Sequence, residues 1–291
     1  MPAHGAGQGE RGLRLRSLLF VPGDRPDRFA KAVESGAHAV ILDLEDSVTP
    51  GRKSVARQAV AEFLASPRAC TVLVRINPAH TPDCDEDLAA ILDRAPDGIV
   101  LPKAEGAASV RALFEKGNLG GAGVLPIATE TPAALFELGT YREVGADLLG
   151  LGWGVEDLSA AIGASTVREP DGGFAGPYRT VRSLALFAAH AAGVPAIETV
   201  YPDIKDLDGL AAYAARGRRD GFGGMLAIHP RQVPVINDAF APSAAELERA
   251  RAVVAAFAAA PDAGALQLDG RMIDRPHFLL AQRLLAIKTE K

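Results

Sequence analysis

Cysteine is scarce in this chain, which has 291 residues and two cysteines, Cys70 and Cys84. Two thiols are too few for a disulfide-stabilised secreted fold or for a zinc site built on cysteine ligands. The N-terminal stretch also lacks the apolar segment of a secretory signal. We therefore expect a cytoplasmic protein with two reduced thiols, and a disulfide between them is the less favoured alternative.

Long runs of one kind of residue are also missing. No stretch of about 18 apolar residues occurs, so we expect no transmembrane segment. No continuous basic block occurs in a chain of formal net charge −5, so nothing indicates a nucleic-acid surface. Residues 1–15 are rich in glycine and polar side chains, and we interpret them as a disordered lead-in.

Short apolar runs, in contrast, recur along the chain, and amphipathic segments with helical spacing separate them. Many of the runs are continuously hydrophobic, which is typical of parallel strands that are covered on both faces. The alternation predicts a (β/α)8 TIM barrel over residues 16–242, with an open doubly wound sheet as the alternative. The eight runs are residues 17–23, 39–46, 71–77, 98–104, 123–130, 148–154, 195–201 and 224–230.

Residues 243–291 exceed what a minimal barrel needs. Ser243 reads as a helix N-cap, with Glu246 three residues later, as in a capping box. We expect a C-terminal helical extension that serves as a lid, an oligomer contact or both.

Charged side chains follow the predicted strands. This is where a catalytic role is expected, because the catalytic groups of such barrels lie where the strands end. Glu130 follows the fifth run and Asp157 the sixth. Two carboxylates from neighbouring strands suit Mg²⁺, which takes one or two carboxylates and completes its shell with water or substrate oxygens. An equally good reading makes them a helix cap and a first-turn acid that stabilise helix dipoles.

Two cations occupy similar positions. Arg75 lies inside an apolar run, where an arginine usually makes a bidentate contact with a carboxylate. That carboxylate belongs either to a substrate or to Asp43 or Glu45. Lys103 is either a Schiff-base amine or, as we favour, a cation that balances the acidic side chains.

Six motifs in order resemble the citrate lyase beta-subunit family of HpcH/HpaI-type aldolases, which includes malyl-CoA and citramalyl-CoA lyases. The motifs are "RSLLFVPGDRPDRFAKA", "AVILDLEDSV", "VRIN", "IVLPKAE", "IATET" and "GVEDLSAAIG". The resemblance covers the chain from about residue 16 to its end. It implies a TIM barrel, a homotrimer, one Mg²⁺ and a CoA thioester substrate.

The resemblance also implies roles for individual residues. Glu130 and Asp157 match the metal ligands, and Arg75 matches the residue that holds the substrate. Asp274, in "GRMID", matches the acid/base that reaches a neighbouring subunit's site. Three further positions are expected to line the same end of the barrel: Asp43, Glu45 and Lys103. Three others are expected to contact the phosphates of CoA: Arg25, Arg28 and Lys31.

These roles predict a Mg²⁺-dependent carbon–carbon lyase. It would cleave a 3-hydroxyacyl-CoA of the malyl, citramalyl or citryl type to an acyl-CoA and a 2-oxo acid such as oxaloacetate, pyruvate or glyoxylate. One alternative is condensation with thioester hydrolysis, as in a malate synthase. Others are an aldolase acting on free 2-oxo acids and a citrate lyase beta subunit acting on an acyl-carrier-protein thioester.

Overall fold

The computed structural model describes residues 15–289, and the predicted lead-in falls almost entirely outside them. These residues belong to two compact units, one ending at Phe240 and the other beginning at Ala241. Among the described residues, no helix combines the length and hydrophobicity needed to cross a membrane.

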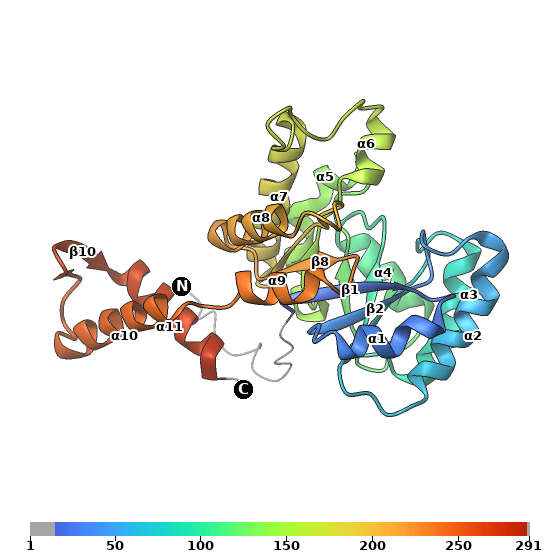
Figure 1. The fold of residues 1–291 in the computed structure, drawn as a ribbon, viewed down its shortest axis with the longest axis horizontal. Coiled ribbons are helices and arrows are strands. Elements are labelled where there is room, and N and C mark those ends of the chain that lie inside the picture. Colours follow the sequence, from blue (N-terminus) through green and yellow to red (C-terminus); the bar gives the residue numbers. More distant parts are fainter. Residues whose placement is uncertain (1–14, 290–291) are drawn as a thin grey trace. The chain divides into compact units, whose positions relative to one another are not determined.

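The first unit is built on eight parallel strands (Figure 1). They pair in the order β5-β4-β3-β2-β1-β8-β7-β6, and β5 and β6 are joined by isolated bridges between Val124 and Leu148 and between Ile127 and Gly152. The sheet therefore closes into a barrel, and the predicted fold class is confirmed. The strands are β1 (Ser17–Pro22), β2 (Ala39–Asp43), β3 (Thr71–Arg75), β4 (Gly98–Leu101), β5 (Gly123–Pro126), β6 (Leu151–Gly152), β7 (Ala196–Glu198) and β8 (Gly224–Ala227).

Helices follow the strands and bury their apolar faces against them. They are α1 (Phe29–Glu34), α2 (Lys53–Leu64), α3 (Pro82–Ile91), α4 (Gly106–Lys116), α5 (Ala134–Glu137), α6 (Glu156–Ile162), α7 (Gly176–Ala192), α8 (Leu207–Asp220) and α9 (Gln232–Ala239). Short 3₁₀ turns extend several connections: Pro26–Arg28, Pro50–Arg52, Leu92–Arg94, Leu138–Glu143 and Gly145–Asp147.

Two apolar clusters explain why the strands read as continuous hydrophobic runs. Side chains such as Ile41, Leu73 and Leu125 fill the barrel interior. Their neighbours Val40, Val72 and others pack outward against the helices. Because strand residues alternate between these two clusters, both faces of each strand are apolar.

The second unit contains more strand than the predicted helical extension. Helix α10 (Ala244–Ala259) begins with the expected capping box between Ser243 and Glu246. An antiparallel hairpin of β9 (Ala265–Leu268) and β10 (Arg271–Asp274) separates it from α11 (Arg275–Thr289). A small core, which includes Phe257 and Ile273, holds this unit together. Its role as a lid or oligomer contact stays a prediction.

Close packing at the start of β8 generates a stability prediction. A Cβ added at Gly224 would lie 1.7 Å from the carbonyl oxygen of Leu15, and this backbone atom cannot rotate away. We expect Gly224→Ala to lower the free energy of unfolding by about 1–3 kcal/mol because of overpacking. Gly51→Ala is the matched control, since a Cβ there meets nothing within 4 Å. Urea denaturation should therefore separate the two variants, and equal midpoints would contradict the packing argument.

Candidate functional site

The carboxyl ends of β2 and β3 hold a bidentate ion pair. Asp43 and Arg75 are register partners, and the Arg75 Nε and Nη2 atoms each donate to Asp43 at 2.6 Å. The Arg75 Nη1 atom also lies 3.1 Å from Glu45 Oε2. Of the partners predicted for Arg75, the structure therefore provides both protein carboxylates. Burial opposes ionisation of Asp43, but the hydrogen bonds and charge of Arg75 hold its pKa below the usual value.

Lys103, after β4, links three of the predicted carboxylates. Its Nζ donates to Glu45 Oε1 at 2.5 Å and lies 3.6 Å from Asp157 Oδ2. Its backbone has φ of 50°, which is uncommon for a side-chain-bearing residue, and its amide donates to Glu130 Oε2 at 2.6 Å. The acidic partners raise the pKa of Lys103 despite partial burial, so the amine stays charged. This geometry fits a charge-balancing cation and argues against a neutral Schiff-base amine.

Glu130 is the least compensated carboxylate of this group. Its side chain is buried, and burial together with the nearby charges of Glu45 and Asp157 raises its pKa to about 8, against the amide and charge of Lys103. Such a group is stabilised by an added cation. Glu45 is affected in the same direction, because burial raises its pKa even though Arg75 and Lys103 oppose the shift.

A cavity of about 280 Å³ opens over these side chains and is referred to below as the mouth cavity. Asp43, Arg75, Glu130 and Asp157 line it, whereas Glu45 and Lys103 lie beside it, paired to these residues. The lining also includes apolar side chains such as Phe20, Trp153 and Leu226, and the Phe20 ring lies 4.7 Å from the guanidinium carbon of Arg75. The cavity can thus offer several carboxylates, a guanidinium and hydrophobic contact to one bound molecule.

The donor set fits a hard divalent cation, which takes carboxylate oxygens and leaves places for substrate. Glu130 and Asp157 reach the mouth cavity from the ends of β5 and β6, and neither is paired bidentately by a cation in the contacts described. Asp157 also lies in the first turn of α6, where the alternative interpretation, an acid that stabilises the helix dipole, places it. Within residues 15–289, no cluster of three or more His, Cys, Asp or Glu side chains is arranged to hold a metal.

The remaining predicted residues are not among those that line the mouth cavity. Arg25 pairs with Asp27 at 2.9 Å, while Arg28 and Lys31 are exposed near the start of α1. Asp274 closes β10 in the second unit, where its Oδ1 lies 2.5 Å from Nδ1 of His277. The roles assigned to all four stay predictions.

The sequence reasoning missed Trp153, which forms part of the mouth cavity wall. It follows β6 directly and is fully buried. A signal was available, because this is the chain's only tryptophan and it stands between two glycines at the end of an apolar run.

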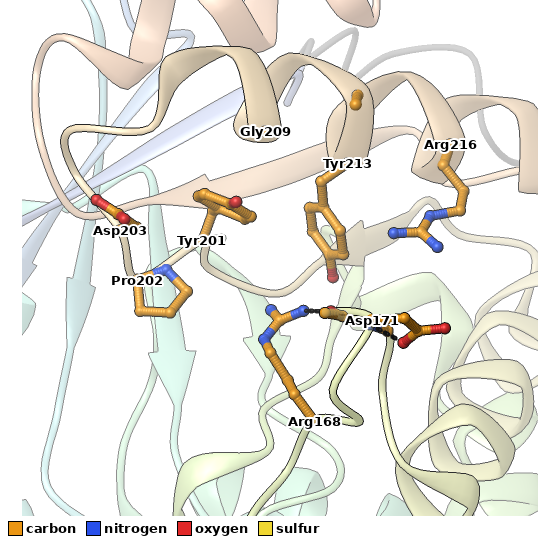
Figure 2. Close-up of a pocket in the computed structure, with 11 residues that line it drawn as sticks. Arg168, Asp171, Tyr201, Pro202, Asp203, Gly209, Tyr213 and Arg216 are labelled. Atoms are coloured by element: carbon orange, nitrogen blue, oxygen red, sulfur yellow. Dashed lines mark hydrogen bonds between the residues drawn. The ribbon is translucent and has the colours of Figure 1, made fainter.

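Figure 2 shows a second, larger cavity of about 490 Å³, between α8 and the segment that carries Arg168 and Asp171. Arg168, Tyr201, Tyr213 and Arg216 line it together with Asp171 and other residues. Its acidic residues are tied to nearby backbone amides, as Asp171 Oδ1 is to Gly173 N at 2.9 Å. Because it lacks the buried carboxylates of the barrel mouth, we assign the chemistry to the smaller mouth cavity.

Comparisons with known proteins address the family of the chain. The HpcH/HpaI aldolase/citrate lyase family model matches residues 16–230. A citrate lyase subunit beta-like protein of Mycobacterium tuberculosis is 37% identical over 273 residues, covering 92% of this chain and 93% of that protein. A (3S)-malyl-CoA thioesterase of Cereibacter sphaeroides is 33% identical over 278 residues, with 94% of each chain covered.

The fold comparison gives the same result. The crystal structure of CitE from Mycobacterium tuberculosis in complex with magnesium, acetoacetate and coenzyme A has a TM-score of 0.80 and 38% sequence identity. The match covers 94% of this chain and 98% of that one. The resemblance drawn from the six motifs is confirmed, and the chain belongs to the HpcH/HpaI aldolase/citrate lyase family.

Proposed function

We propose that the chain is a Mg²⁺-dependent carbon–carbon lyase that cleaves a 3-hydroxyacyl-CoA of the malyl, citramalyl or citryl type. The observation that carries the proposal is the convergence of Glu130, Asp157 and Arg75 on one cavity at the carboxyl end of the barrel. Family membership supports the lyase class, and a solved relative contains magnesium, acetoacetate and coenzyme A.

Each side chain has a distinct task in this reaction. Glu130 and Asp157 would hold the cation, and Lewis-acid stabilisation of substrate oxygens is the chemistry that bound Mg²⁺ supplies. Arg75, held by Asp43, would orient the carboxylate of the 2-oxo acid. Lys103 donates to Glu45 and places a positive charge among the carboxylates of the mouth cavity.

Cleavage breaks the bond between the hydroxyl-bearing carbon and the carbon next to the thioester. The hydroxyl gives its proton to solvent water and becomes the ketone of the 2-oxo acid, while the electron pair of the broken bond passes to the acyl-CoA carbon, which becomes an enolate. Asp274 would deliver one proton to that carbon, a transfer typically worth about 10²–10⁴-fold in rate. In the condensing direction the same group would remove that proton.

The malate-synthase-like alternative uses the same groups and then hydrolyses the thioester. It would release free CoA thiol, whereas the lyase releases an intact acyl-CoA, so a thiol assay separates them. The beta-subunit alternative requires turnover of acyl-carrier-protein thioesters and none of CoA thioesters by the isolated chain. A relative described as a (3S)-malyl-CoA thioesterase favours testing hydrolysis directly.

Loss of either proposed metal ligand tests this function. We expect Glu130→Ala or Asp157→Ala to lower Mg²⁺-dependent kcat/KM for CoA thioesters by about 100-fold or more, because each removes one proposed ligand. Glu137→Ala, at an exposed acid on α5, is the control and should retain activity. Near-wild-type turnover by both site variants, with folding intact by circular dichroism, would remove the metal assignment.

Proton release should accompany Mg²⁺ binding. The pKa of Glu130 is raised to about 8, so at pH 6–7 the carboxyl is mostly protonated and must lose its proton to bind a cation. We expect about one proton released per Mg²⁺ at pH 6–7 and almost none at pH 9. Calorimetry in two buffers of different ionisation enthalpy measures this number. Glu130→Gln should abolish the release, while Glu137→Gln should not.

The sign of the accompanying stability change follows from the same pKa. Since the folded pKa lies above the usual value of about 4.3, protonation of Glu130 favours the fold. This contribution is complete below about pH 4 and is lost as the pH rises to about 8. The metal-free protein should therefore lose stability to urea over this window relative to Glu130→Gln, and parallel curves would contradict the assignment.

A subunit-mixing experiment tests Asp274 and the predicted homotrimer together. If Asp274 completes a neighbouring subunit's site, Asp274→Asn and Arg75→Gln should each be nearly inactive alone. Random hybrids of the two place both intact residues at about a quarter of the sites, so about a quarter of wild-type activity should return. No recovery, with hybrids confirmed by native mass spectrometry, would count against a shared site.

A further inference from the structure

We propose that Glu198 is a positioning residue for the mouth cavity, acting through the indole of Trp153. The inference rests on the proposed function, because it assigns Glu198 the task of keeping Glu130 and Asp157 in register for one cation. Glu198 is the last residue of β7 and does not line the mouth cavity itself.

Buried donors surround the Glu198 carboxylate. Its Oε1 accepts from the indole Nε1 of Trp153 at 2.7 Å and from the hydroxyl of Tyr213 at 2.8 Å. Its Oε2 accepts from Nε of Arg182 at 2.8 Å, and Nη2 of the same guanidinium lies at 2.6 Å. The Glu198 side chain is fully buried, so an ion with these partners is costly to rearrange and fixes the indole direction.

The segment after Trp153 connects this anchor to the proposed ligands. Gly154 is cross-linked to Thr129, since its amide donates to Thr129 Oγ1 at 3.0 Å and its carbonyl accepts from the same hydroxyl at 2.8 Å. Thr129 immediately precedes Glu130, and Asp157 follows Gly154 by three residues. The ends of β5 and β6 therefore move together, and the position of Trp153 sets both.

Aromatic packing holds the other side of the indole. Phe174 meets Trp153 edge to face, with ring centroids 5.3 Å apart, and the guanidinium of Arg168 lies 4.5 Å from the Phe174 centroid. Figure 2 shows that guanidinium directed toward Tyr213, at the floor of the second cavity. Packing fills the space around the indole, and the hydrogen bond to Glu198 fixes the direction of its N–H group.

Glu198→Gln tests the proposal with two readouts that do not depend on turnover. The substitution keeps the shape but removes the charge, and its NH2 group must face a donor, either Arg182 or the indole of Trp153. We expect Mg²⁺ affinity by calorimetry to fall about 10- to 100-fold, the range for residues that orient a metal's ligands. Fluorescence of the metal-free protein should also shift to longer wavelength, with acrylamide quenching increased about twofold or more. Trp153 is the chain's only tryptophan, so this signal reports on it alone.

Asp87→Asn is the matched control for a general loss of stability. Asp87 is also a fully buried carboxylate, bonded to Arg57 at 2.6 Å and to the amide of Asn77 at 2.8 Å, but it does not contact Trp153. It should weaken the fold without changing the emission of Trp153. Equal effects of the two substitutions on emission and Mg²⁺ affinity would overturn the proposal.

A double-mutant cycle tests whether Glu198 acts through the indole. Trp153→Phe removes the N–H group and keeps an aromatic wall, so Glu198→Gln should change Mg²⁺ affinity by less than about threefold in that background. An undiminished effect in the Trp153→Phe background would overturn the assigned route. If the wild type binds no Mg²⁺, the proposed function fails, while the metal-free emission still decides whether Glu198 positions Trp153.

Discussion

Concentrated negative charge at the carboxyl end of the barrel is the constraint on which the site depends. Five carboxylates, those of Asp43, Glu45, Asp46, Glu130 and Asp157, face two cations, Arg75 and Lys103. Asp43 forms a bidentate ion pair with Arg75, and Glu45 contacts both Arg75 and Lys103. The remaining carboxylates are Asp46, Glu130 and Asp157, and a divalent cation bound to Glu130 and Asp157 would offset their charge. Burial, together with the charges of Glu45 and Asp157, raises the pKa of Glu130.

The backbone around the mouth is shaped by the same constraint. The left-handed conformation of Lys103 aims its amide at Glu130 while its amine reaches Glu45. Residues in such conformations cost about 1–3 kcal/mol, which the surrounding contacts must offset. The Thr129–Gly154 link and the anchor at Glu198 then join the ends of β5, β6 and β7. The polar side chains are thus carried by strand ends that are linked to one another. The free-energy cost of placing like charges close together is confined to the mouth cavity.

Much of this arrangement follows from sequence patterns, for identifiable reasons. Parallel strands covered on both faces are continuously apolar, so runs such as residues 39–46 and 71–77 revealed the barrel. An arginine in "VLVRIN" required a carboxylate, and the register of β2 and β3 supplies Asp43. Lys103 was foreseen as a counter-charge, but its amide contact to Glu130 depends on a φ angle that residue type does not reveal. Long-range partners such as Glu198 and Trp153, 45 residues apart, leave no local pattern. The β9–β10 hairpin was missed because its strands are short and largely exposed.

The central claim is that Glu130 and Asp157 together hold one divalent cation, and anomalous diffraction from crystals grown with Mn²⁺ in place of Mg²⁺ tests it most directly. Mn²⁺ accepts the same oxygen ligands and scatters anomalously, so its position is found without reference to activity. The account predicts one strong peak bonded to both carboxylates at the barrel mouth. A peak bound elsewhere, or to only one of the two, with the mouth cavity holding water alone, would contradict it.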